Sequence, residues 1–277
     1  MTAGAALHGH LHLVCERDAA TGRTFVGAQS FAAPMHLSKP HWDGRTLIIN
    51  AVNPTAGLFS GDTVEISVAA RPAASALFTS PSASRVHRAR ADEPAAHVRQ
   101  RFTVDAGGWL EVCPEMLIAQ AGSRYEQEST LEVTGNGGLL FVDCLAPGRV
   151  ASGEVFAFEK VRCRTRLTVD GELVAVENCR LSPGDHSLHP LRVHHEHSYH
   201  ATWFAVLPDP VAPGPFVRSV SALSGDRVAS GASALNPRAF VGKILAADSP
   251  SMRKAITGVR ELVYAQAGRD LPLWRKL

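Results

Sequence analysis

The sequence lacks the features that indicate several common function classes. Its 28 basic and 26 acidic residues leave a net charge of +2, which is too balanced to indicate a nucleic-acid or anionic-membrane partner. The longest apolar runs, such as residues 139–142, are long enough only for strands. The first residues have neither the basic region nor the apolar core of a secretory signal, so we expect a cytoplasmic protein.

Catalytic and redox motifs are also missing. The five cysteines are odd in number and form no CxxC pair, so reduced thiols are the simplest interpretation. The sequence contains no GxxxxGK[ST], no GxSxG after a strand, no HExxH and no GxGxxG. These absences favour binding over catalysis, and we expect no enzyme activity and no tightly bound cofactor.

What the sequence does contain is a regular β pattern. Residues 161–169 alternate between apolar side chains and arginines, and Asp170-Gly171 is typical of a type I′ turn into a second strand at residues 173–176. Asn136-Gly137 predicts another hairpin of the same kind. Turn signals about every ten residues indicate a sandwich, barrel or β-solenoid.

The pattern changes near the C-terminus. A proline-rich segment at residues 208–215 predicts a loop. Ser249 as N-cap and Pro250 after it predict a helix. Its apolar stripe comprises Met252, Ile256, Val259 and Val263, and its opposite face carries Arg253, Arg260 and Glu261. We therefore predict one mainly β domain over residues 1–277, with a β body at about 8–207 and a C-terminal strand and helix at about 216–277.

Histidines are frequent and clustered. The chain has 13, of which His8, His10 and His12 alternate and would share one face of a strand. Another group falls within seven residues and contains His194, His195, His197 and His200. Neutral imidazoles bind nickel, copper and zinc, although exposed loop histidines without any ligand are common. A metal-dependent β-barrel enzyme of cupin type, built on the second group, is the alternative function from a different class.

Four carboxylates occur at strand ends or in apolar surroundings. They are Asp62, Asp143, Glu154 and Glu177. Pairing with a nearby arginine is the usual structural explanation for such residues. The functional alternative is an acidic channel wall for a divalent cation, in which all four face an internal polar cavity.

Several segments, in order along almost the whole chain, resemble the UreD (UreH) family of urease accessory proteins. Residues 53–62 resemble the family's Asn-Pro-Pro-Gly-Gly-x-x-Gly-Gly-Asp loop, and residues 113–118 resemble its Leu-Pro-Gln-Glu-Thr-Ile segment. Residues 146–154 resemble its Leu-Gly-Arg-x-Ala-Ser-Gly-Glu segment. The chain departs from the pattern at Thr55-Ala56, Ser60, His87 and Met116, which indicates a divergent member.

The resemblance implies a fold, partners and candidate surfaces. Members of this family have a flattened, β-helix-like two-layer body with a small helical part. They dock on urease apoprotein and, with a helical accessory partner (UreF) and a GTPase (UreG), support delivery of Ni(II) to urease. Residues 79–88 also resemble a serine/threonine-rich strand of the family that ends in an aromatic-Arg pair. The resemblance thus implies transient Ni(II) contact and partner-binding residues among the matched motifs, here Arg85, Arg88, Glu115 and Arg149.

Overall fold

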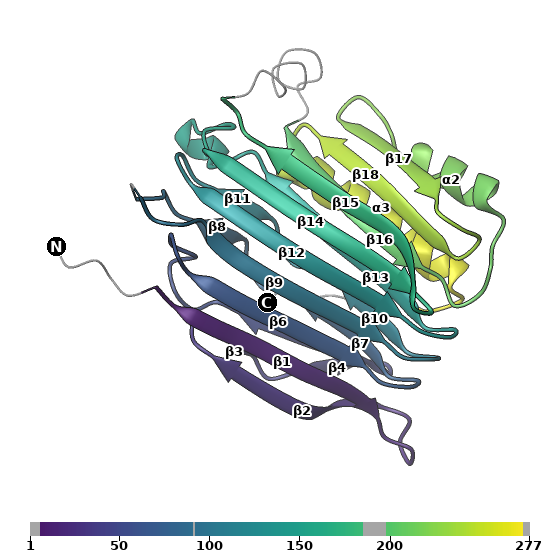
Figure 1. Cartoon of the computed structure of the whole chain (residues 1–277). Helices are drawn as coiled ribbons and strands as arrows, with labels where there is room; N and C mark the ends of the chain where they lie inside the picture. Colours follow the sequence, from purple (N-terminus) through teal and green to yellow (C-terminus); the bar gives the residue numbers. More distant parts are fainter. Residues whose placement is uncertain (1–5, 91, 185–197, 274–277) are drawn as a thin grey trace.

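Two β-sheets stacked face to face make up most of the computed structural model, which describes residues 6–90, 92–184 and 198–273 (Figure 1). The first sheet has seven strands and forms the front layer of Figure 1, and the second has eleven and lies behind it. The helices lie on the outer face of the second sheet. The predicted mainly β, two-layer fold with a small helical C-terminal part is confirmed.

Between β6 and β14 the chain winds as a solenoid. Each coil places one strand in the first sheet and the next in the second, as in β6 then β7, β9 then β10, and β12 then β13. The coils stack in parallel register within each sheet. The first sheet contains, in spatial order, β15 (Glu172–Leu181), β14 (Lys160–Val169), β12 (Arg124–Val133), β9 (Ala96–Val104), β6 (Thr63–Ala70), β1 (His8–Arg17) and β2 (Thr24–Ala32).

The second sheet combines parallel coils with an antiparallel extension, in which β13, β16, β18 and β17 pair in that order. The parallel pairing of β13, β10, β7 and β5 excludes the closed antiparallel barrel of the cupin alternative. The second sheet contains, in spatial order, β17 (Val228–Ala234), β18 (Ala239–Ala246), β16 (Tyr199–Val206), β13 (Gly138–Ala146), β10 (Trp109–Val112), β7 (Ser75–Thr79), β5 (Thr46–Val52) and β3 (His36–Leu37). Three short strands lie off this order: β4 (His41–Asp43) pairs with β5, β11 (Leu117–Ala119) pairs with β13, and β8 (Ser84–Val86) pairs with β11.

One of the two predicted hairpins is wrong. Asp170 and Gly171 have φ angles of 52° and 82°, as a type I′ turn requires, and β14 and β15 pair antiparallel around them. At the second position the only positive φ is 55° at Gly135, and β12 and β13 lie in different sheets. The turn there crosses between the layers because β12 and β13 each have a parallel neighbour from the preceding coil.

Helix α3 (Ser249–Gln266) buries its apolar stripe on the second sheet, as predicted. Its N-cap is Asp248, whose carboxylate accepts from the Ser251 amide, and not Ser249 as the sequence suggested. The loop prediction for residues 208–215 is wrong at its end, because helix α2 (Pro213–Ser221) begins there with proline in its first turn. Among the described residues, no helix combines the length and hydropathy needed to cross a membrane.

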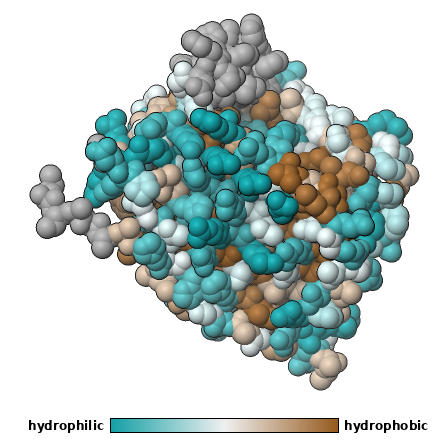
Figure 2. Space-filling model, in the orientation of Figure 1, coloured by the Kyte–Doolittle hydropathy of each residue, from teal (hydrophilic) through white to brown (hydrophobic). Residues whose placement is uncertain are grey.

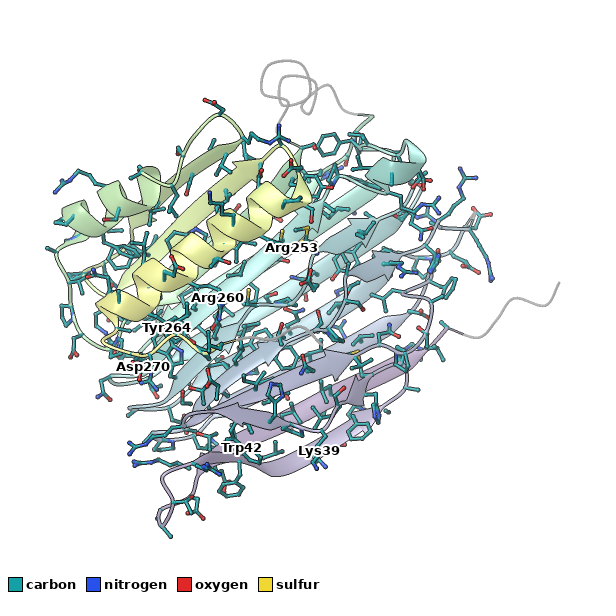
Figure 3. The ribbon with its side chains drawn as sticks, turned by 180° about the vertical axis from the view of Figure 1, so that it is seen from behind. Lys39, Trp42, Arg253, Arg260, Tyr264 and Asp270 are labelled. Atoms are coloured by element: carbon teal, nitrogen blue, oxygen red, sulfur yellow. The ribbon has the colours of Figure 1, made fainter. Side chains whose placement is uncertain are left out.

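A buried polar cluster joins α3 to the second sheet. Glu111 on β10 accepts from Arg260 and, at 2.7 Å, from the Tyr264 hydroxyl, which itself accepts from Trp109 Nε1 at 3.0 Å. Arg260 was predicted on the solvent face of the helix, but it is only 6% exposed. Figure 3 shows Arg253, Arg260 and Tyr264 along α3, which crosses the back of the second sheet.

The outer face of the first sheet is hydrophilic. Its register sets rows of alternating charge across the strands, for example Glu65, Arg99, Glu128 and Arg164. Figure 2 shows this face, with a hydrophobic patch near the beginning of the edge strand β15. The inner faces pack into two separate apolar clusters, one around Phe102 and Phe141 and the other around Val98 and Val161.

Candidate functional site

A band of polar side chains crosses the space between the two sheets. On the inner face of the first sheet, strand register aligns Gln127, Cys163 and Cys179 in one row. The next row contains Gln100, Ser129, Thr165 and Glu177. On the facing second sheet, register aligns Asp143, Thr202 and Lys243. These ten residues are called the polar band below.

The inward positions explain why the band is narrow and has apolar residues on either side. Side chains two residues apart share one face of a strand, so β9 presents Val98, Gln100 and Phe102 to the interior. The same alternation on β12 gives Gln127 and Ser129 between Tyr125 and Leu131. Parallel stacking then aligns the polar positions of successive strands across the sheet.

Hydrogen bonds link the band from sheet to sheet. The amide of Gln127 donates to Asp143 Oδ2 at 2.8 Å and to Ser129 Oγ at 3.3 Å. Ser129 in turn donates to Gln100 at 3.3 Å, and the Tyr125 hydroxyl donates to Gln127 at 2.7 Å. At the β15 edge, Lys243 of the second sheet donates to Glu177 of the first.

Two cavities meet in this band. The larger, about 170 Å³, is lined by inward residues of both sheets and by loop residues at 53–58 and 80–85, of which Thr55 and Arg85 are exposed. The smaller, about 20 Å³, lies toward the β15 edge and is lined by Cys163, Glu177 and His200 among others. Asp143 lines both cavities and so lies at their junction.

Burial sets the charge states at the junction. It raises the pKa of Asp143 to about 6, although hydrogen bonds from Gln127 and the Cys163 thiol oppose this. Burial, followed by the nearby Lys243 ammonium, lowers the pKa of His200 to about 4. At neutral pH the carboxylate is therefore mostly ionised and the imidazole neutral, which are the forms that bind a divalent cation.

The band is not fully satisfied by the protein. Within the described part of the chain, the buried Thr202 hydroxyl has no hydrogen-bond partner. No group of three or more His, Cys, Asp or Glu side chains in that part is arranged to hold a metal ion. The polar groups are instead spread along the band, with space beside them.

Comparison with known proteins identifies the family. The model of the family "UreD urease accessory protein" matches residues 7–275. The chain is 38% identical over 262 residues to the urease accessory protein UreD of Opitutus terrae. The matched region covers 92% of this chain and 93% of the relative. It is also 32% identical to UreD of Haloarcula marismortui, over 73% of this chain and 67% of the relative. The chain belongs to the UreD family. Its role is therefore that of a urease accessory protein.

The structure brings together only part of the carboxylate set predicted to face a polar cavity. Asp143 and Glu177 lie in the polar band. Asp62 does not: its carboxylate accepts from the backbone amides of Leu7 and Phe59 at 2.9 and 2.8 Å and so orders the loop that resembles the UreD motif. Glu154 is paired with Arg149, which holds its pKa below the usual value.

The predicted histidine group is only partly described. His194, His195 and His197 lie outside the described residues. His200 lines the smaller cavity of the band. At the N-terminus, the His10 and His12 rings stack 4.8 Å apart and hydrogen-bond to Ser30 and Ser67, on the outer face of the first sheet and away from the band.

Two of the four residues that the resemblance suggested for partner contacts line the larger cavity. Arg85 and Glu115 line that cavity, and Glu115 also pairs with Arg253 of α3 at 3.1 Å. Arg88 is exposed beside Gly122, and Arg149 is exposed and holds Glu154.

Most residues of the polar band were not predicted from the sequence. Gln100, Gln127, Ser129 and Thr165 were not singled out, because each is an ordinary polar residue within an alternating strand. The available signal was the position of each one on the apolar side of the alternation. Aligning them required the parallel register of coils that are about thirty residues apart in sequence.

Proposed function

We propose that this member of the UreD family is a non-enzymatic scaffold that supports insertion of Ni(II) into urease, and that the ion passes along the polar band. The observation that carries the proposal is the position of Asp143, an ionisable group at the junction of two cavities between the sheets. The accessory role of the family supports the choice of cargo.

The chemistry of the band suits passage better than storage. It offers carboxylate, amide, hydroxyl and thiol groups, and His200 adds an imidazole at the smaller cavity. All of these groups can replace water around Ni(II). Because these donors are spread across the sheet, an ion would meet a few of them at a time. A closed site with four converging ligands would hold the ion instead.

The scaffold role requires partners. We propose urease apoprotein, a UreF-like helical protein and a UreG-like GTPase as these partners, with no nucleic acid or membrane involved. Arg85 and Glu115 at the larger cavity are the residues we expect nearest to a partner that supplies or receives the ion. A complex in solution that contains the chain, urease subunits and the GTPase would support this part.

Passage is tested by replacing the Asp143 carboxylate with an amide. Asp143→Asn keeps the size of the side chain and an oxygen that can accept from the Gln127 amide, but it removes the negative charge. We expect urease activity and urease-bound nickel to fall by about 10- to 100-fold, the loss that follows removal of even a supporting contact at a metal site.

Glu132→Gln is the matched control, since Glu132 pairs with Arg101 on the outer face of the first sheet. It should leave nickel loading unchanged. Full loading of urease by a correctly folded Asp143→Asn variant would refute the proposed path. Loss of complex formation in that variant would assign Asp143 to assembly and not to passage.

A further inference from the structure

Two thiols face each other inside the polar band. Cys163 on β14 and Cys179 on β15 are direct antiparallel partners, in the regular part of the ladder. Residues directly opposite in such a ladder point to the same side and have Cα atoms about 4.5–5.5 Å apart. Disulfides span Cα separations of about 4.4–6.8 Å, so the hairpin already holds this pair within bonding range.

The environment of the pair differs from that of the other cysteines. Cys15, Cys113 and Cys144 are buried, whereas Cys163 and Cys179 are half-buried. β15 is an edge strand, so one side of the pair is near solvent. Both thiols line the smaller cavity with Asp143, and the Cys163 thiol donates a hydrogen bond to that carboxylate.

We propose that Cys163 and Cys179 form a reversible disulfide in the presence of a low-molecular-weight disulfide such as oxidised glutathione, and that this bond blocks the polar band beside Asp143. Formation of the bond depends only on the fold. Its effect on the cargo rests on the proposed function.

The reaction is an ordinary two-step exchange. The Cys179 thiolate attacks one sulfur of oxidised glutathione, which forms a mixed disulfide and releases one glutathione thiolate. The Cys163 thiolate then attacks Cys179 Sγ and releases the second. The protein loses two protons and two electrons, and oxidised glutathione is reduced to two thiols. Burial raises the pKa of both thiols, and it raises that of Cys163 well above the ordinary value. The nearby Lys243 ammonium opposes this at Cys179, which makes Cys179 the better first nucleophile of the two.

The bond would change the band at its narrowest part. The smaller cavity has a volume of about 20 Å³, which is room for about one water molecule. Joining the two sulfurs moves them within this space. It also removes the thiol proton that Asp143 now accepts, so the carboxylate loses one of the two hydrogen bonds that favour its ionised form.

The first measurement detects the bond. Reduced full-length protein is incubated with oxidised glutathione, denatured, alkylated and analysed by intact mass and non-reducing peptide mapping. We expect a loss of two hydrogens and a cross-linked pair of peptides that contain Cys163 and Cys179. Absence of that cross-link, or a stable glutathione adduct on Cys179 in its place, would overturn the proposal.

The second measurement detects the block. Oxidised protein should activate urease at least tenfold less than reduced protein, and dithiothreitol should restore activation. The Cys163→Ala/Cys179→Ala variant should be insensitive to oxidant. Equal activation by oxidised and reduced protein would overturn the block. If the reduced protein itself fails to activate urease, the proposed function fails, while the cross-link result stands separately.

Discussion

The two faces of the second sheet each hold a carboxylate, Glu111 fully buried and Asp143 half-buried, and they treat it differently. On the outer face, Glu111 accepts from Arg260 and Tyr264 beneath α3. On the inner face, Asp143 receives only the Gln127 amide and the Cys163 thiol, and the described residues bring no cation into contact with it. One carboxylate is neutralised by the protein, and the other is left able to attract a charge from outside.

This difference separates a structural acid from a functional one. A buried carboxylate with a bidentate arginine is held in one geometry, and its charge is compensated within the fold. A buried carboxylate without a cation costs stability that a purely structural position would not retain. The contrast therefore identifies Asp143 more clearly than its burial alone.

The largest effect should come from breaking the outer cluster. Glu111→Gln removes the charge opposite Arg260 in an apolar environment, and we expect the free energy of unfolding to fall by about 3–5 kcal/mol. Urea denaturation followed by circular dichroism measures this. The double variant Glu111→Leu/Arg260→Met should recover most of the loss, because it removes both charges together. A loss below 1 kcal/mol for the single variant would show that the outer pair does not hold α3.

The inner carboxylate should give a pH-dependent effect of opposite sign. Its pKa is raised to about 6 in the folded chain, from an ordinary value of 3.8. Between these values the folded protein holds a proton that the unfolded chain releases, so this group makes stability fall as pH rises from about 4 to about 6. Asp143→Asn should therefore become more stable relative to the original chain over that range, by about 1–3 kcal/mol, and then level off.

Chemical denaturation at several pH values, with the Glu132→Gln variant as reference, checks this prediction. A difference in stability that does not depend on pH would mean that the ordinary pKa persists in the fold. The contrast between Asp143 and Glu111 would then be lost.

A smaller effect is expected at the unpaired hydroxyl of the band. Thr202→Val keeps the shape of the side chain and removes a buried oxygen without a partner among the described residues, so stability should rise by about 1 kcal/mol. Nickel loading of urease should fall, because the band loses a donor to the cargo. Thr103→Val, on the outer face of the first sheet, is the control and should change neither. Higher stability with full nickel loading would remove Thr202 from the path.

The smallest effect is expected at a carboxylate that an arginine holds. Glu154→Gln leaves the polar band untouched, since Glu154 accepts from Arg149 and the Ala121 amide. Nickel loading should remain unchanged in the reconstituted assay. A strong loss in a folded variant would show that pairing with arginine does not exclude a carboxylate from function, and would weaken the contrast between Glu111 and Asp143.

Local sequence patterns predicted many of the strands and turns, but not how successive coils pair in parallel within each sheet. The alternation at residues 161–169 and the Asp170-Gly171 turn were sufficient for the β14–β15 hairpin. Asn136-Gly137 carries a similar signal, yet it connects two sheets, because parallel partners from the preceding coil are invisible in a local window. Arg260 shows the same limit, since its partner Glu111 is distant in sequence.

The candidate site was predictable only where charge made a residue conspicuous. Asp143 and Glu177 were found because a carboxylate after an apolar run is unusual. Asp62 and Glu154 shared that signal, but backbone amides and Arg149 satisfy them. Gln127 and Thr165 carry no charge, and only the stacked register shows that they belong to the same band as Asp143 and Glu177.

The Glu177–Lys243 pair at the β15 edge has a consequence for release of the cargo. Glu177 already has a positive partner, and that partner is tethered to β18. If the proposed function is correct, a metal ion that reaches this end has to compete for the Glu177 carboxylate with the Lys243 ammonium, which the fold always holds beside it. Such a built-in competitor shortens the residence time of the ion and favours its departure toward a stronger acceptor.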